Sequence, residues 1–333
     1  MAHFGEFVET LLSPVILFFV LGALAAFARS DLAIPEPLSK ALALYLMAAI
    51  GLKGGILVAE NGVSADLILA ALAGIAFSCL IPLAAFAILK GFGRLDGTNA
   101  AAIAAHYGSV SVVTFIAGSQ VLTDAGYPPA GYMVAVLALM ETPAIIVGLF
   151  LASRGGVRTS VASGGSSSAF HNNSELIRET LLNGSVVLLT GSFIIGLIIG
   201  KQGFEPIAPV FQTGFTGLLC LFLLDMGLLA ARRLREAQSL TARLVFLGIA
   251  FPIINGALGC LIGTLIGLDV GTTSALAILA ASASYIAVPA AMRLALPKAD
   301  AGLYLAMSLA ITFPFNITLG IPLYLMLATW MAA

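Results

Sequence analysis

The sequence predicts an all-α membrane protein, with about ten transmembrane helices arranged as two inverted five-helix repeats. Three observations support this fold class: the apolar composition, the placement of the positive charges, and short motifs shared by the two halves. Of the 333 residues, 60% are hydrophobic and only 9% are charged, whereas soluble domains carry roughly 25% charged residues. Lipid must therefore solvate much of the surface.

The predicted spans follow from the apolar segments, because a helix needs about 20 such residues to cross a bilayer. The first dozen residues carry Glu6 and Glu9 but no Lys or Arg. They lack the basic region of a signal peptide, so the first apolar segment is expected to be retained as a helix. The spans are predicted near residues 10–28, 38–59, 66–90, 98–122, 129–153, 183–201, 208–231, 242–267, 271–293 and 301–331.

Residues 154–182 differ from the other connections. They are rich in Gly and Ser, a composition that cannot bury a core and predicts a flexible cytoplasmic linker. This linker separates a first repeat, residues 1–153, from a second and inverted repeat, residues 183–333. The segment is interpreted as a plain linker, with modification of its Ser and Thr residues or contact with a regulator as the alternative.

The basic residues orient the predicted bundle. Of the 15 Lys and Arg residues, all except Lys53 and Lys201 fall in predicted loops on one side of the membrane. Positive charge is retained on the cytoplasmic side, so this side is expected to face the cytoplasm and both termini to lie outside. One missed span would disrupt the alternation, which supports the count of ten.

Three short motifs of the first half return in the second half in one register. The paired segments are 95–100 and 269–274, 52–57 and 224–229, and 141–143 and 312–314. Their offsets lie between 171 and 174 residues. Because each half holds five spans, an odd number, the second copy enters the membrane from the opposite side. This arrangement is typical of secondary transporters.

Two predicted spans are interrupted near their centres by small and polar residues. The first break runs from His106 to Ser111, and the second runs from Ser282 through Ser284 and Tyr285 to Pro289. Backbone N–H groups at the start of a half-helix form an anion site, and serine hydroxyls add donors and acceptors. The alternative is that these small residues only allow helices to approach closely.

Buried polar residues near the breaks suggest a cation site. Glu141 and Asn316 lie at the same predicted depth as the breaks, and Pro143 and Pro314 each free a backbone carbonyl one turn earlier. Hard cations take oxygen ligands of this kind, so a sodium or proton site is expected at Glu141, Thr312 and Asn316. The alternative is a structural hydrogen bond from Glu141 between the fifth and ninth spans.

Three other ionisable residues in the spans are given structural roles. Lys53 and Asp225 differ in predicted depth by about 15 Å at 1.5 Å per residue, so an ion pair between them is not expected. Lys53 is instead expected to extend toward the outer interface. His106 is interpreted as a hydrogen-bonded structural histidine, with a proton relay as the alternative.

Other classes of protein find less support. The sequence contains no Gly-x-Ser-x-Gly or His-Glu-x-x-His motif, which disfavours a membrane-embedded enzyme. A passive channel needs a continuous polar path, whereas the polar residues here gather at mid-depth. A basic patch with interleaved aromatics, as nucleic-acid binding requires, is also missing from the sequence.

Taken together, these motifs resemble the SbtA-type sodium-dependent bicarbonate transporter family over essentially the whole chain. The segments that carry the resemblance are 34–37, 50–55, 108–111, 141–143 and 312–316. The resemblance implies a fold similar to that of sodium/bile-acid symporters and an elevator-like movement. It also implies a homotrimer in the bacterial inner membrane, with a core of spans 3–5 and 8–10 and a scaffold of spans 1, 2, 6 and 7. A PII-like regulatory protein is implied on the cytoplasmic face.

The resemblance also implies a bicarbonate site, with sodium as the coupling ion and no other cofactor. The family's substrate loop is matched at Gly108, Val110, Ser111 and Thr114, but valines at positions 112 and 113 replace its second Gly and its Ser. The expected substrate-binding residues are therefore Gly108, Ser109, Val110, Ser111, Thr114, Ser282, Ser284 and Tyr285. One co-transported sodium cancels the charge of the anion, which otherwise enters a negative cell at a cost of about 2.3 kcal/mol per 100 mV.

Overall fold

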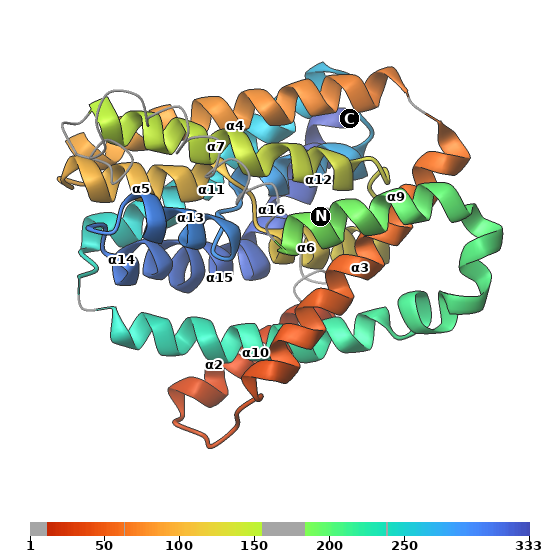
Figure 1. The fold of residues 1–333 in the computed structure, drawn as a ribbon, viewed down its shortest axis with the longest axis horizontal. Helices are drawn as coiled ribbons and strands as arrows, with labels where there is room; N and C mark the ends of the chain where they lie inside the picture. Colours follow the sequence, from red (N-terminus) through yellow and green to blue (C-terminus); the bar gives the residue numbers. More distant parts are fainter. Residues whose placement is uncertain (1–11, 63, 155–183, 238) are drawn as a thin grey trace.

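The computed structural model describes residues 12–62, 64–154, 184–237 and 239–333 of the chain. Within these ranges the regular structure is entirely helical (Figure 1). The predicted linker, apart from Arg154 at the end of a helix, lies outside the described residues, as does the predicted start of the first span.

The first half of the chain forms six described helices. Their bounds are α2 Pro14–Phe27, α3 Glu36–Asn61, α4 Ala65–Gly91, α5 Gly97–Gly108, α6 Val112–Asp124 and α7 Met133–Arg154. The second half begins with α9 Gly184–Phe204, short turns Glu205–Ile207 and Pro209–Thr213, α10 Phe215–Glu236 and α11 Ala242–Leu265. It continues with α12 Val270–Ala281 and α13 Ala287–Ala295. The last helical segment is α14 Ala301–Leu305, a π-helical stretch Ala306–Thr312, α15 Phe313–Phe315, a second π-helical stretch Asn316–Gly320 and α16 Ile321–Ala332.

Each predicted span coincides with a described helix or with a broken pair of helices. Eight of these segments are long and apolar enough to cross a membrane, and two more, Pro14–Phe27 and Val270–Ala281, are shorter apolar helices. The multi-pass membrane fold is therefore confirmed for the described residues. The exact count of ten stays a prediction.

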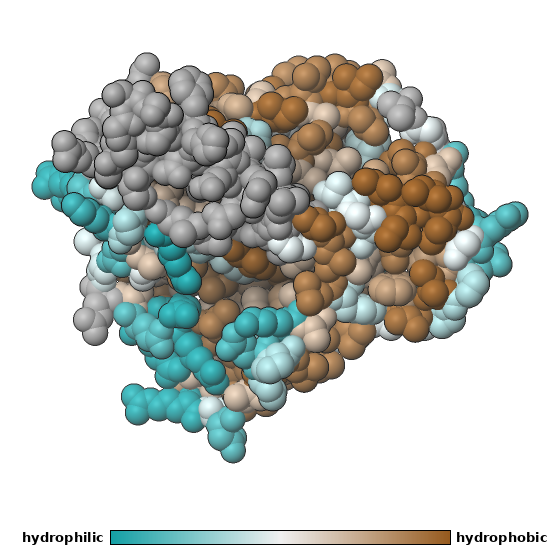
Figure 2. Space-filling model, viewed as in Figure 1, coloured by the Kyte–Doolittle hydropathy of each residue, from teal (hydrophilic) through white to brown (hydrophobic). Residues whose placement is uncertain are grey.

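Apolar side chains cover much of the surface. Ile198, Leu265 and Trp330 are 76%, 71% and 67% exposed, and hydrophobic residues occupy large parts of the face shown in Figure 2. A soluble protein would not expose so many large apolar side chains together. We infer that these apolar side chains contact the lipid of a membrane.

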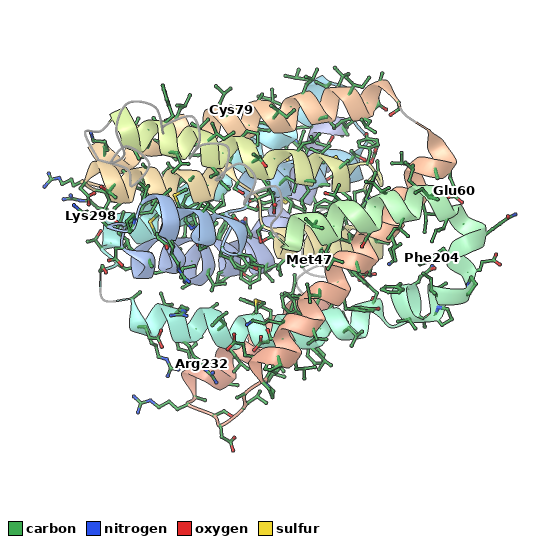
Figure 3. The ribbon with its side chains drawn as sticks, in the orientation of Figure 1. Met47, Glu60, Cys79, Phe204, Arg232 and Lys298 are labelled. Atoms are coloured by element: carbon green, nitrogen blue, oxygen red, sulfur yellow. The ribbon has the colours of Figure 1, made fainter. Side chains whose placement is uncertain are left out.

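Lys298 and Arg232 lie toward one end of the bundle, called here the basic end, whereas Glu60 and Phe204 lie toward the other (Figure 3). Near this end a nitrogen of Arg232, in the last turns of α10, donates to the Leu32 carbonyl oxygen in the connection between α2 and α3 at 3.0 Å.

The broken pair α5–α6 occupies the centre of the molecule. All residues of its most apolar 18-residue window are buried, and so is α12 from Gly271 to Ala281. Both pairs begin with an aspartate that caps the first helix: Asp96 accepts the N–H groups of Thr98 and Asn99, and Asp269 accepts that of Thr272. These caps satisfy N–H groups that a helix start leaves open.

Glycines allow two helix pairs to touch backbone to backbone. Helix α2 packs along α10, and α3 packs along α9. A Cβ added to Gly22 would collide with the Leu224 carbonyl oxygen, and one added to Gly227 would collide with that of Phe19. Small residues at helix crossings are the usual means of close packing in membranes, where lipid removes the hydrophobic drive to associate.

The α3–α9 crossing repeats this arrangement. A Cβ on Gly55 would collide with the Phe193 carbonyl oxygen, and one on Gly196 with that of Leu52. Gly55 and Gly227 are 172 residues apart, and Gly22 and Gly196 are 174 apart. These offsets match those of the sequence motifs.

Two loop contacts also correspond. At the basic end the Asp300 N–H donates to Asn99 Oδ1 at 2.7 Å. At the opposite end the Ala130 N–H donates to Thr272 Oγ1 at 3.0 Å. In both places a side chain in the first turn of a buried half-helix holds the loop before another span.

The glycine contacts give a stability prediction. Gly227→Ala is expected to lower the free energy of unfolding by roughly 1–3 kcal/mol, because the added methyl group must displace the backbone of α2. Gly217→Ala is the matched control: it lies in the same helix with open space around its Cβ position. The control is expected to be neutral or stabilising by up to about 1 kcal/mol. Thermal unfolding of both variants in one detergent tests this, and equal Tm values would contradict the backbone contact.

Candidate functional site

The two helix breaks meet inside the protein, as the sequence predicts. The Ser111 N–H donates to Ser282 Oγ at 2.9 Å, and the Ser284 N–H donates to the His106 carbonyl oxygen at 2.9 Å. The Ser282 hydroxyl donates in turn to the Leu279 carbonyl oxygen at 2.9 Å. Each break thus satisfies polar groups that the other leaves open. This is the condition under which non-helical backbone persists at membrane depth.

Four half-helix ends converge here. Helices α5 and α12 end at the crossing and present carbonyl oxygens, whereas α6 and α13 begin there and present N–H groups. Ser111 caps α6, because its Oγ accepts the Thr114 N–H at 3.2 Å and the Thr114 hydroxyl at 2.9 Å. The start of α13 has no side-chain cap at Ile286. The crossing therefore offers N–H groups to an anion and carbonyl oxygens to a cation.

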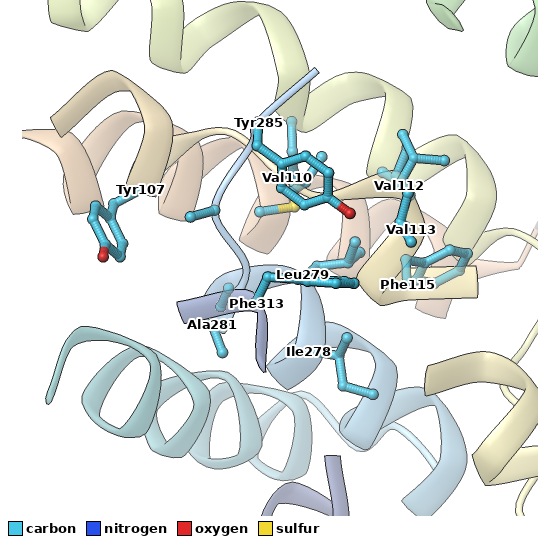
Figure 4. Close-up of a cluster of buried hydrophobic side chains, with 14 of the residues drawn as sticks. Tyr107, Val110, Val112, Val113, Phe115, Ile278, Leu279, Ala281, Tyr285 and Phe313 are labelled. Carbon is cyan, nitrogen blue, oxygen red and sulfur yellow. The ribbon is translucent and has the colours of Figure 1, made fainter. Parts of the chain in front are cut away.

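A small cavity of about 10 Å³ lies at this crossing. Its wall is formed by Val110, Ser111, Val112, Glu141, Ser284, Tyr285 and Ile286. Figure 4 shows Tyr285 and Val110 close together, with Val112 and Val113 beyond them on α6. Because a water molecule needs roughly 10–15 Å³, this conformation holds about one water, and a larger solute requires the wall to open.

Glu141 on α7 brings a carboxyl group to the cavity. The residue is 2% exposed, and its Oε2 has no hydrogen-bond partner within the described part of the chain. The structural hydrogen bond considered for this oxygen is therefore not formed there. A carboxylate at such depth costs about 2.5–3.5 kcal/mol on insertion scales, which favours a bound proton or cation beside it.

Thr312 and Asn316 belong to a neighbouring hydrogen-bond network. The Thr312 hydroxyl donates to the Gly248 carbonyl oxygen at 2.7 Å and accepts from the Tyr107 hydroxyl at 2.7 Å. Asn316 Nδ2 donates to the Ala281 carbonyl oxygen at 2.9 Å, and Tyr324 donates to Asn316 Oδ1 at 2.8 Å. Neither side chain lines the cavity that Glu141 enters. In this conformation the three expected sodium ligands are not gathered around one cavity.

Asn316 nevertheless reaches the crossing. Its amide donates to the last carbonyl of α12, at Ala281, one residue before Ser282. The π-helical stretches on both sides of α15 shift the register of this span by widening its turns. Asn316, at the start of the second stretch, thus faces the second break, whereas Thr312, at the end of the first, faces Gly248 and Tyr107.

Three other ionisable residues of the spans lie outside the wall of this small cavity. His106 Nδ1 lies 2.7 Å from the Ala102 carbonyl oxygen and therefore carries a proton. Its ring stacks on Tyr304 with centroids 4.5 Å apart. Lys53 Nζ lies 4.3 Å from the centroid of the Phe215 ring, and Asp225 accepts from the Ser39 hydroxyl at 2.5 Å. The Lys53–Asp225 pair is not formed, as expected.

Some of the substrate-binding residues predicted from sequence line the small cavity, and the others lie outside its wall. Val110, Ser111, Ser284 and Tyr285 line the cavity together with Glu141. Gly108, Ser109, Thr114 and Ser282 are buried around it without forming its wall. Gly108 has a specific packing role, because a Cβ there would collide with the Pro82 ring of α4.

Sequence reasoning missed the roles of several neighbours. It did not assign Ile286 to the wall, or Tyr107 and Tyr324 as the partners of Thr312 and Asn316. The isoleucine could have been found only from the extent of the second break. The tyrosines come from other spans, so no local pattern indicates their partners.

Crossed half-helices inside a bundle of apolar helices are typical of secondary transporters. A family model described as the Na⁺-dependent bicarbonate transporter superfamily matches residues 14–329, from α2 to α16. The chain therefore belongs to the Na⁺-dependent bicarbonate transporter superfamily. Membership in a family of transporters favours that class over the enzyme and channel alternatives. The comparison with curated proteins found no match for the chain.

The crossing gives a second stability prediction. Ser282→Ala is expected to destabilise the protein by about 1–3 kcal/mol, because the buried Ser111 N–H loses its acceptor. Ser274→Ala is the matched control in the same half-helix, where the hydroxyl only donates to the Val270 carbonyl oxygen one turn earlier. Thermal unfolding in detergent compares the two, and the idea fails if Ser282→Ala is no less stable than its control.

Proposed function

We propose that this protein carries bicarbonate into the cell together with sodium, as a symporter that works by an elevator-like movement. The single observation that carries this proposal is the crossing of two half-helix starts beside the buried carboxyl group of Glu141, whose Oε2 has no hydrogen-bond partner among the described residues. The N–H groups and the hydroxyls of Ser111 and Ser284 suit a small oxyanion. The carboxylate suits the cation.

The two ions support each other electrostatically at this site. A monovalent anion entering a negative cell works against about 2.3 kcal/mol per 100 mV, and one sodium ion cancels that charge. Sodium beside Glu141 also neutralises the carboxylate, which would otherwise repel an anion a few ångströms away. Binding of either ion thus favours binding of the other.

We assign Thr312 and Asn316 to the sodium site as further oxygen ligands. Their oxygens accept hydrogen bonds from Tyr107 and Tyr324 in the present conformation. Each oxygen keeps a further lone pair for a cation, but neither side chain lines the cavity that Glu141 enters, so a shift of the last span is needed to bring them to Glu141. The proposed site is thus assembled as the transporter moves, with Glu141 as its fixed member.

Corresponding contacts support an inverted repeat with two moving parts. The glycines of the α2–α10 crossing correspond to those of the α3–α9 crossing at the same residue offset as the sequence motifs. The loop contacts at Asn99 and Thr272 correspond in the same way. We propose that α2, α3, α9 and α10 form the scaffold. The core is then formed by α4–α7 and α11–α16, which contain both helix breaks.

The orientation and assembly are also proposals. The basic end is assigned to the cytoplasm, because retained positive charge marks that side, and both termini then lie outside. The family resemblance suggests a homotrimer in the bacterial inner membrane. It also suggests a PII-like regulatory protein at the cytoplasmic face.

A second small anion is a specific alternative. Val112 lines the cavity where the resembling loop has a glycine, and Val113 replaces the serine of that loop, so the wall is bulkier and the loop has one hydroxyl fewer than the family pattern implies. An oxyanion that needs fewer hydrogen-bond partners would suit this wall. Competition for uptake by nitrate or formate distinguishes this alternative from bicarbonate.

Uptake of labelled bicarbonate into proteoliposomes tests the proposed function. Parent protein is expected to show uptake that depends on an inward sodium gradient. Glu141→Gln is expected to lower it by about tenfold or more, because the charged ligand of the cation is lost. Glu36→Gln is the matched control, since that glutamate pairs with Lys40 on an exposed helix start. Sodium-independent uptake by the parent, or full sodium-coupled uptake by Glu141→Gln, would refute the assignment.

A further inference from the structure

A second and larger cavity lies at the end of the bundle opposite the basic end. Its volume is about 360 Å³, and it lies toward the end where Figure 3 labels Glu60 and Phe204. One wall comes from α3, α9 and α10, and the other comes from α6 and the segment leading into α7. The cavity therefore separates the proposed scaffold from the proposed core. Its size falls within the range of small-molecule sites, about 300–1,000 Å³.

Lys53 places a cation in the wall of this cavity. Its stem comes from the middle of α3, and its Nζ lies over the Phe215 ring, 4.3 Å from the centroid. No carboxylate in the described part of the chain forms an ion pair with it. Asp225 occupies the position in the second half that corresponds to Lys53. Its carboxylate accepts a hydrogen bond from the Ser39 hydroxyl. An aromatic face only partly replaces the water that this ammonium group has lost.

The other charged groups of the cavity leave it positive. Glu60 and Lys201 line it together with Lys53, so the three side chains sum to one positive charge at neutral pH. An excess of one positive charge between largely apolar walls favours anions over cations in the cavity.

Ser119 adds an unused donor beside the cation. The residue lines the same cavity from α6, is 7% exposed, and its hydroxyl has no hydrogen-bond partner among the described residues. A buried hydroxyl without a partner is uncommon, because its desolvation is not repaid. Because the Ser119 oxygen is itself buried, an oxyanion paired with Lys53 would accept from this hydroxyl once the side chain turns toward the cavity.

One helix joins this cavity to the crossing. Phe115 and Ser119 of α6 line the larger cavity, and Val112, at the start of the same helix, lines the small one together with Ser111. Phe115 is 2% exposed and lies one turn from Ser111, beside Val112 and Val113 in Figure 4. A solute in the larger cavity thus lies along α6 from the crossing, with the Phe115 ring between them.

We propose that the cavity between α3 and α6 is a capture site, in which Lys53 and Ser119 bind the transported monovalent oxyanion before it passes Phe115 to the crossing. This inference rests on the proposed function for the identity of the anion. Lys53 is a binding residue for the approach step and takes no part in the sodium site.

The first test measures charge in the cavity without transport. Ala130→Cys places a thiol in the cavity wall, and its reaction rates with sulfonatoethyl and trimethylammonioethyl methanethiosulfonate are measured after subtraction of the parent's rates. Adding Lys53→Met is expected to lower the ratio of the anionic to the cationic rate by roughly three- to tenfold. Lys53→Arg should keep the ratio. Lys40→Met, at the other end of the same helix, is the matched control and should also keep it.

The second test measures the approach step in proteoliposomes. Lys53→Met is expected to raise the KM for bicarbonate by roughly three- to tenfold, with the maximal rate and the KM for sodium within about twofold of the parent. Lys53→Arg should restore the KM. A lowered maximal rate with an unchanged KM would overturn the capture site, since it would place Lys53 in folding or movement.

The two tests separate the inference from the function on which it rests. An unchanged reactivity ratio in Lys53→Met overturns the capture site even if sodium-dependent bicarbonate uptake is found. Parent protein that takes up no bicarbonate while Lys53 still controls the ratio overturns the proposed substrate. In that case the capture site stands for another small anion.

Discussion

The structure depends on one constraint: polar backbone groups at membrane depth need partners that lipid cannot provide. Two helices are broken at that depth, and each break supplies part of what the other lacks, through Ser111, Ser282 and Ser284. Such a crossing can exist only inside protein, which explains why α5, α6 and α12 are buried along their length. The surrounding helices therefore shield these few residues from lipid.

The helices that keep lipid away from the crossing are packed differently on the two sides of the molecule. On one side, α2 with α10 and α3 with α9 touch backbone to backbone at glycines, which leaves little freedom to slide. On the other side, a cavity of about 360 Å³ separates α3 from α6. Relative movement is easiest where side chains do not interlock, so the proposed elevator-like movement would separate the two parts at this boundary. The buried carboxyl group and the half-helix ends belong to the proposed core.

Much of this organisation could be predicted from the sequence. Apolar segments and interrupted spans are local signals, and they placed the helices and both breaks to within a few residues. The shared register of Gly55 and Gly227 also indicated a repeat before any contact was known. The sequence could not indicate that Tyr107 and Tyr324 hold Thr312 and Asn316. Those contacts join residues from different spans and depend on the π-helical turns of the last helix, which no periodicity reveals.

The small size of the central cavity has a consequence for the membrane that contains the protein. A space for about one water molecule cannot support a continuous column of water between the two aqueous phases. Ions therefore have no hydrated route through this crossing at rest. A cell could hold many copies of the protein without short-circuiting the voltage across the membrane that contains them.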